Sequence, residues 1–223
     1  MLAWKHLDSS TIPGQGGTIH LYCRGDEFSI RLDNYELMNS RLHGSEDSLA
    51  ELACAGINHR SAPRVLIGGL GMGYTLAAAL VPLSQKAQVV VAELVPAVVV
   101  WNRGPLAQLA GSPLEDHRVS VCEGDVGEII RQQKRGFDAI LLDVDNGPEG
   151  LTRPENDRLY GLAGLNDARK ALRSGGVLAV WSASPDKKFS QRLTKAGFKV
   201  EEVQVKARKG SKGKVKHTIW LGT

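Results

Sequence analysis

Two groups of residues in this 223-residue chain could do chemistry: a glycine loop, and carboxylic acids that follow apolar runs. The loop contains Gly69, Gly71 and Gly73 and comes directly after the apolar run 65–67. Glycines at this spacing let a backbone take positive φ and approach a ligand closely. A helix after the loop would add free N–H groups and the positive end of its dipole. The pattern predicts a strand, a tight turn and a helix that together bind a ligand.

Glu93 is the first of these acids and ends a second apolar run, 89–92. It lies about twenty residues after the last glycine, and in nucleotide-binding βαβ units an acid at that distance accepts hydrogen bonds from ribose hydroxyls. The alternative is a solvated carboxylate at a strand end. The spacing favours ribose binding. Asp125 follows a third run, 118–122, where it is a candidate cap for the next helix.

Asp143 and Asp145 follow a fourth apolar run, 137–142. Two acids spaced two apart on an extended chain point to the same side. Open α/β sheets bind ligands at the carboxyl ends of their strands, which is where these acids would lie. They are therefore candidates to orient or deprotonate a reacting group. For Asp145 and Asn146 the alternative is that they only begin the turn before Gly147.

Strands and helices alternate from residue 64 onward, with Pro96 in the first turn of one helix and Gly175-Gly176 as the stop of another. The last two strands form a hairpin rather than another crossover. We therefore predict an α/β fold: a Rossmann-like, doubly wound, mostly parallel seven-stranded sheet with an antiparallel C-terminal strand.

A smaller β segment precedes this sheet. Residues 18–38 alternate apolar and polar side chains around a polar turn, which predicts a hairpin or meander. Ser45 is a candidate N-cap for a helix that ends near Gly56. We expect an N-terminal β segment over 1–44 and a nucleotide-binding domain over 45–223.

Composition limits the class of protein. Hydrophobic residues make up 42% of the chain, which is enough for a core, yet no run approaches the length of a membrane span. The first residues lack the layout of a signal peptide, so we expect a cytoplasmic protein that meets no membrane. The cysteines are too widely spaced for a disulfide frame, and no histidine has metal-ligand spacing, so no metal is expected. The cysteines are Cys23, Cys54 and Cys122, and the histidines considered are His43, His59 and His217.

The net charge of +4 is local, because residues 206–216 carry six basic side chains and no acid. Without this stretch the chain is slightly acidic. A basic patch could bind nucleic acid, but the stretch has no interleaved aromatic residues and lies at an expected hairpin tip. We favour a solvated tip and keep nucleic-acid binding through residues 206–216 as the alternative.

From about Leu21 to its end, the chain resembles the spermidine synthase (polyamine aminopropyltransferase) family and its relatives of class I S-adenosylmethionine-dependent methyltransferase fold. Residues 69–76 resemble the family's G-G-G-D-G-G-T-L loop, and residues 137–143 resemble its Y-D-V-I-I-x-D strand. The resemblance implies that Glu93 holds ribose and that Asp125 reads adenine. It also suggests a homodimer.

The chain departs from the family pattern near the expected reaction centre. Met72 stands where the family's loop has Asp, Asn146 replaces a second acid, and Trp181 replaces a Gln. Residues 44–46 match the family's Y-H-E segment poorly. Because Asn is neutral and cannot act as a base, the loss of acids weakens both the holding and the deprotonation of an amine.

We therefore predict an S-adenosylmethionine-dependent transferase that transfers a methyl group to an unidentified small-molecule acceptor. The cofactor is S-adenosylmethionine or its decarboxylated form. The first alternative is aminopropyl transfer from decarboxylated S-adenosylmethionine to an amine, and the second is a catalytically silent nucleoside-binding module. The predicted residues are Asp143 and Asp145 for catalysis; Gly69, Gly71, Met72, Gly73, Glu93 and Asp125 for the cofactor; and Asn146, Tyr160 and Trp181 for the substrate.

Overall fold

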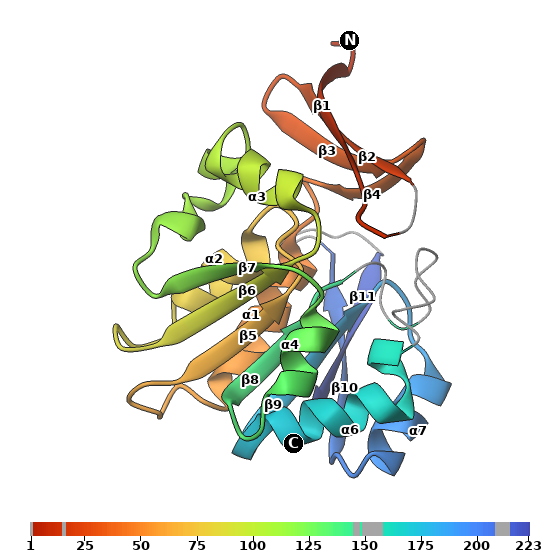
Figure 1. Cartoon of the computed structure of the whole chain (residues 1–223). Helices are drawn as coiled ribbons and strands as arrows, with labels where there is room; N and C mark the ends of the chain where they lie inside the picture. Colours follow the sequence, from red (N-terminus) through yellow and green to blue (C-terminus); the bar gives the residue numbers. More distant parts are fainter. Residues whose placement is uncertain (1, 15–16, 145–147, 149–157, 208–214) are drawn as a thin grey trace.

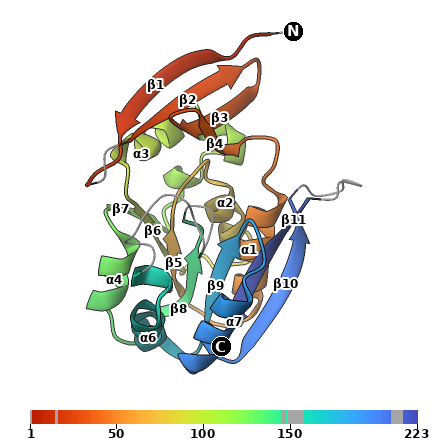
Figure 2. The ribbon, with the colours of Figure 1, turned by 90° about the vertical axis from the view of Figure 1, so that its right-hand side faces the viewer.

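The computed structural model describes residues 2–14, 17–144, 148, 158–207 and 215–223. Within these residues the chain forms two β-sheets, with the smaller N-terminal sheet standing over one edge of the larger sheet (Figure 1, Figure 2). The predicted residues Asp145 and Asn146 lie outside the described residues, as does most of the lysine-rich stretch. Predictions made for them stay predictions.

The N-terminal sheet is antiparallel, with its strands in chain order. Leu21 pairs with Ile30, and both are buried on the face that looks toward the larger sheet. The expected meander over 18–38 is confirmed. An additional first strand was not predicted, because almost all its side chains are exposed and give no apolar alternation. The strands are β1 (Lys5–Thr11), β2 (Thr18–Arg24), β3 (Glu27–Leu32) and β4 (Tyr35–Asn39).

The larger sheet has seven strands in the order β10-β11-β9-β8-β5-β6-β7. All neighbouring pairs from β9 to β7 are parallel, and β11 runs antiparallel to both β9 and β10. The predicted fold class is confirmed. The strands are β5 (Arg64–Gly68), β6 (Gln88–Glu93), β7 (Val119–Glu123), β8 (Phe137–Leu142), β9 (Leu172–Ser182), β10 (Val200–Lys206) and β11 (Lys216–Gly222).

Helices cover both faces of this sheet because successive strand residues point to opposite sides. On β5, Val65 and Ile67 belong to the core with α1, α2 and α3, whereas Leu66 belongs to the core with α4, α6 and α7 (Figure 1). The helices are α1 (Gly44–Ala55), α2 (Tyr74–Leu80), α3 (Pro96–Arg103), α4 (Val126–Gln132), α6 (Leu162–Ala171) and α7 (Lys187–Lys195), with short 3₁₀ turns η1 (Ala107–Ala110) and η2 (Pro113–Glu115).

Two local predictions are wrong. Ser45 does not cap α1: the helix begins one residue earlier, at Gly44, and the hydroxyl of Ser45 is used elsewhere. Gly175 and Gly176 do not stop a helix before a later strand, because they lie inside β9. Gly175 has φ +69° where the pairing of β8 with β9 shifts register, so the glycines form a bulge in the strand.

Other local predictions are confirmed. Pro96 is in the first turn of α3, and the Asp125 side chain caps α4 by accepting the N–H of Gly127 at 2.6 Å. In the part of the chain that the structure describes, no helix is long and apolar enough to cross a membrane. The carboxyl ends of the parallel strands lie at the edge beneath the N-terminal sheet (Figure 2).

Candidate active site

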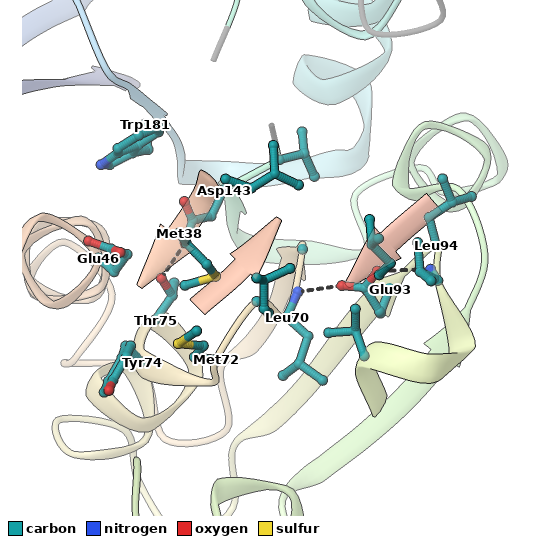
Figure 3. Close-up of a pocket in the computed structure, with 18 of the residues that line it drawn as sticks. Met38, Glu46, Leu70, Met72, Tyr74, Thr75, Glu93, Leu94, Asp143 and Trp181 are labelled. Atoms are coloured by element: carbon teal, nitrogen blue, oxygen red, sulfur yellow. Dashed lines mark hydrogen bonds between the residues drawn. The ribbon is translucent and has the colours of Figure 1, made fainter. Parts of the chain in front are cut away.

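A cavity of about 410 Å³ lies between the carboxyl ends of the parallel strands and the inner face of the N-terminal sheet (Figure 3). The N-terminal sheet and the segments that flank its strands contribute an apolar wall. The residues of that wall are Ile12, Ile19, Ile30, Leu32, Leu37, Met38 and Leu42. Such a wall excludes water, so polar groups on the opposite side interact in a medium of low dielectric constant.

The glycine loop packs tightly against Asp143 after β8 and against Met38 of β4. Gly69 has φ +87°, and a Cβ there would collide with the backbone carbonyl of Asp143. Gly71 has φ +52°, and a Cβ there would lie 2.9 Å from the sulfur of Met38 on β4. Conformation favours glycine at both positions, and at Gly69 the backbone carbonyl of Asp143 also leaves no space for a side chain. The third glycine, Gly73, has φ +83° and precedes α2, but it does not line the cavity.

Glu93 ends β6 and is buried, with its carboxylate directed back toward the glycine loop (Figure 3). Its Oε2 accepts the N–H of Leu70 at 2.9 Å, and its Oε1 accepts the N–H of Val95 at 2.9 Å. The acid therefore fixes the loop to the start of α3. A carboxylate has about four acceptor positions, so it can do this and also accept hydrogen bonds from a ligand.

Asp125 and Gly124 line the cavity at the carboxyl end of β7. The Asp125 side chain caps α4, and the same residue lines the cavity. Capping a helix and contacting a ligand are compatible. Asp125 and Glu93 therefore lie at the ends of neighbouring strands. Both residues line the cavity at the same edge of the sheet, because the two parallel strands end there.

Asp143 follows β8 and lines the cavity beside the glycine loop. Its Oδ2 accepts the hydroxyl proton of Thr75, the second residue of α2, at 2.6 Å (Figure 3). Burial raises the pKa of Asp143 to about 6, and the hydrogen bond from Thr75 offsets part of that rise. Near neutral pH this carboxyl group is therefore close to its own titration.

Glu46 is a second carboxyl group in the cavity that the sequence analysis did not select. It comes from α1, is 8% exposed, and points toward the same space as Asp143 (Figure 3). Burial, then the charge of Asp143, raises the pKa of Glu46 to about 8. A signal was available: Leu49, Ala50 and Ala53 follow at helical spacing and are buried, so Glu46 lies on the core-facing side of its helix.

Aromatic and polar side chains complete this end of the cavity. Trp181, near the end of β9, lines the cavity and contacts His217 of β11 edge-on, with ring centres 4.8 Å apart. Its indole N–H is buried and has no hydrogen-bond partner within the described residues. Ser45 lies beside Glu46, and its Oγ is 2.8 Å from Nδ1 of His217. A buried donor without a partner is costly, so a ligand group that accepts the indole N–H of Trp181 would be stabilising.

The structure therefore brings most of the predicted residues together. The predicted residues that line this cavity are Gly69, Gly71, Met72, Glu93, Asp125, Asp143 and Trp181. Tyr160 is not among the lining residues: it is fully buried against Phe189 and donates its hydroxyl to the Val144 carbonyl at 3.4 Å. Tyr160 is thus placed to hold Val144 rather than to face the cavity.

The charge of the cavity is one-sided. Among the residues that the structure describes, four carboxyl groups line it, from Glu46, Glu93, Asp125 and Asp143. Within the described residues, no lysine or arginine lines it, and burial lowers the pKa of His217 and so keeps its ring neutral. The end of the cavity around Glu46 and Asp143 suits a cationic group far better than an anionic one.

The order of the seven strands and a cavity at their carboxyl ends define the class I S-adenosylmethionine-dependent methyltransferase fold. Within that class the chain has the spermidine synthase-like fold. No family model matches the chain, and no curated protein matches it in sequence. The likeness is one of structure.

Three solved structures illustrate it, each matched over 98% of this chain. Spermidine synthase from Thermotoga maritima has a TM-score of 0.76, 19% identity, and 72% of its chain covered. A spermidine synthase in complex with the transition-state analogue AdoDATO has a TM-score of 0.75, 18% identity, and 72% covered. A probable spermidine synthase from Corynebacterium glutamicum ATCC 13032 has a TM-score of 0.65, 16% identity, and 79% covered.

Proposed function

We propose that this protein transfers an aminopropyl group from decarboxylated S-adenosylmethionine to an amine. The observation that carries the proposal is the charge of the cavity, in which carboxyl groups are present without a lysine or arginine among the described lining residues. Decarboxylated S-adenosylmethionine carries a sulfonium and an ammonium group but no carboxylate, and an amine acceptor is also a cation. A cavity of this charge attracts both reactants.

Methyl transfer from intact S-adenosylmethionine, which the sequence favoured, is the second candidate. It rests on Met72, an apolar side chain that is 1% exposed and occupies the loop position where the family pattern has an acid. Against it, the carboxylate of the intact molecule would lie near Asp143 and Glu46 without a cationic partner among the described residues. Burial of an unpaired charge beside charges of like sign is unfavourable.

The residues present fit a nucleoside of this kind. Glu93 would hold the ribose, Asp125 the base, and the backbone at Gly69 and Gly71 would pass close to the chain attached to sulfur. Bound there, the sulfonium compound supplies an activated carbon and a neutral thioether leaving group. The protein's own contribution is then to position the amine in line with that carbon. The apolar wall of the N-terminal sheet keeps competing water away.

The amine must arrive at, and lose a proton near, Asp143 and Glu46. Asp143 lies directly beside Gly69, because the carbonyl of Asp143 fills the space that a side chain at Gly69 would need. An acceptor held by the Asp143 carboxylate would therefore be next to the loop that holds the reacting carbon. Alignment of this kind is worth several kcal/mol of the barrier, roughly 7–11 when geometry is ideal.

The test is product analysis. Purified protein is incubated with decarboxylated or intact S-adenosylmethionine and a panel of mono- and diamines, and the nucleoside products are separated by mass. We expect methylthioadenosine from the decarboxylated form. S-adenosylhomocysteine from the intact form would instead establish methyl transfer. Binding of either nucleoside with no product across the panel would indicate the silent binding module.

Calorimetry on a matched pair of variants tests the nucleoside end independently. Glu93→Ala should lose binding of methylthioadenosine by about 10-fold or more, because it removes the ribose acceptor and releases the loop N–H groups. Glu123→Ala is the control: Glu123 pairs with Glu93 in register at the end of β7 but is exposed and outside the cavity. Equal losses in the two variants would remove Glu93 from the proposed site.

A further inference from the structure

A short hydrogen-bonded chain joins Glu46 of α1 to His217 of β11, two residues that both line the cavity. It begins at Glu46, whose Oε2 accepts the hydroxyl proton of Ser45 at 2.6 Å. The same Ser45 oxygen is 2.8 Å from Nδ1 of His217, a residue 172 positions away in sequence. Ser45 is fully buried, while His217 is partly exposed. The aminopropyl transfer proposed above does not say which carboxyl group takes the proton of the amine, and it gives Ser45 and His217 no role.

A serine hydroxyl between a carboxyl group and an imidazole can move a proton between them. The hydroxyl has one donor and two acceptor positions, so it can accept a proton from one neighbour while it donates to the other. Burial lowers the pKa of His217, so the ring is neutral and one of its two nitrogens is an acceptor. With Nδ1 as that acceptor and Glu46 protonated, the Ser45 hydroxyl turns from Glu46 to Nδ1 and accepts the proton of Glu46, so the path runs from Glu46 through Ser45 to His217.

The groups that face Glu46 set its charge. Asp143 lies across the cavity and is an acid, and Tyr74 of α2 stays neutral because burial raises its pKa to about 12. Asp47, the next residue of the same helix, is paired with His43: its Oδ2 lies 3.2 Å from Nδ1 of His43. Glu46 and Asp143 therefore form an interacting pair, and no lysine or arginine among the described residues lines the cavity beside them. Near neutral pH such a pair retains one proton.

We propose that Glu46 accepts the proton that the attacking amine loses, and that Ser45 passes this proton to His217. This inference rests on the proposed aminopropyl transfer. An incoming ammonium group favours ionisation of both carboxyl groups, so binding first expels the resting proton along the same path.

The transfer step is balanced in charge and atoms. The ammonium nitrogen gives one N–H proton to the Glu46 carboxylate, and the freed lone pair attacks the carbon bound to the sulfonium. The C–S bond breaks with its electrons kept by sulfur, and the new C–N bond leaves a secondary ammonium. Asp143, which remains ionised, balances that charge. One proton is released per turnover, and it leaves Glu46 through Ser45.

The two carboxyl groups divide these tasks because their surroundings separate their pKa values. Their hydrogen bonds differ: Thr75 donates to Asp143 and so favours its charged form, whereas Glu46 is joined through Ser45 to His217, which can take a proton onward. Burial and the charge of Asp143 raise the pKa of Glu46, which favours its protonated form. A general base works best when its pKa lies near the working pH. Pairs of carboxyl groups with separated pKa values recur where one stabilises charge and the other carries the proton.

The first experiment counts protons without turnover. Calorimetric titration of 1,4-diaminobutane into protein saturated with methylthioadenosine is repeated in buffers of different ionisation enthalpy near pH 7.5. Wild type should release close to one proton on binding, and Glu46→Gln should release none. The control is Glu51→Gln, the same change on an exposed face of the same helix, which should behave as wild type. Unchanged release in Glu46→Gln, or no amine binding to wild type, would overturn the inference.

The second experiment measures turnover. With 1,4-diaminobutane, Glu46→Gln should reduce kcat about 100-fold and Ser45→Ala about 10-fold, in line with loss of acid–base assistance. Methoxyamine, which is unprotonated near neutral pH, should be used equally well by both variants and by wild type. A Glu46→Gln defect as large with methoxyamine would show a merely structural role. Wild type that makes no methylthioadenosine would refute the proposed function, and the proton count would then decide the role of Glu46 alone.

Discussion

The two ends of β8 carry the same residue type in opposite circumstances. At the start of the strand, Asp138 is fully buried and accepts hydrogen bonds from Arg60 at 2.5 Å, Arg173 at 2.8 Å and the backbone N–H of Arg64 at 2.7 Å. Just past the other end, Asp143 accepts a hydroxyl from Thr75 at 2.6 Å. Within the described residues, no cationic side chain pairs with Asp143.

The difference separates structure from chemistry. Two arginines of the protein compensate the charge of Asp138. Asp138 therefore joins three segments of the chain and is not available to a ligand. The charge of Asp143 is not compensated, so its pKa is raised to about 6 and a bound cation would complete its surroundings. Folding therefore depends on the carboxylate at the amino end of the strand, and the proposed reaction on the one at the carboxyl end.

The largest expected effect is on activity at the carboxyl end. Asp143→Asn should reduce the formation of methylthioadenosine by about 100-fold or more, since the neutral amide cannot balance an ammonium charge. Binding of methylthioadenosine should change by less than about threefold, because the nucleoside residues are elsewhere. Turnover and calorimetry on the same preparation check both. Wild-type turnover in this variant would show that Asp143 is not needed for the reaction.

At the amino end the same substitution should affect stability instead. Asp138→Asn leaves two guanidinium groups without their carboxylate and should lower the free energy of unfolding by about 3 kcal/mol. Denaturant unfolding measures this, with Asp167→Asn as the control, since Asp167 forms an exposed pair with Lys170 worth less than about 1 kcal/mol. Turnover per folded molecule should stay at the wild-type level. A loss of activity without a loss of stability would break the comparison.

The pH dependence of stability should reveal the Glu46–Asp143 pair. Both groups hold protons more tightly when folded, so their contribution to the free energy of unfolding falls as pH rises from about 4 through their folded pKa values of about 6 and 8. Glu46→Gln removes most of this dependence. Its melting temperature should therefore exceed that of wild type by several degrees near pH 9 and by little near pH 5. Parallel profiles for the two proteins would contradict the raised pKa of Glu46.

The smallest expected effect comes from Thr75. Its hydroxyl favours the charged form of Asp143, so Thr75→Val should raise the pKa of Asp143 further. The acidic limb of the kcat/KM profile should then move upward by about half a unit to one unit. Thr75→Ser keeps the hydroxyl and serves as the control. If both substitutions leave the limb in place, the limb does not report Asp143.

The sequence by itself determined the larger sheet and the positions of the acids at its carboxyl edge. Buried parallel strands are continuous apolar runs, and an acid after such a run is easy to see, so the strands that end near Glu93, Asp125 and Asp143 were all predicted. Positive φ at Gly69 and Gly71 follows from the glycines themselves. These features are local, because each depends on a few neighbouring residues.

Only the tertiary structure brought Glu46, Ser45 and His217 together. Glu46 and His217 lie far apart in sequence, and no spacing rule connects them to Ser45 between them. The exposed first strand, the role of Ser45 inside a helix and the bulge at Gly175 were likewise missed. Pairing across long separations, and the pKa values that follow from burial, arise only when the sheet and its covering helix come together.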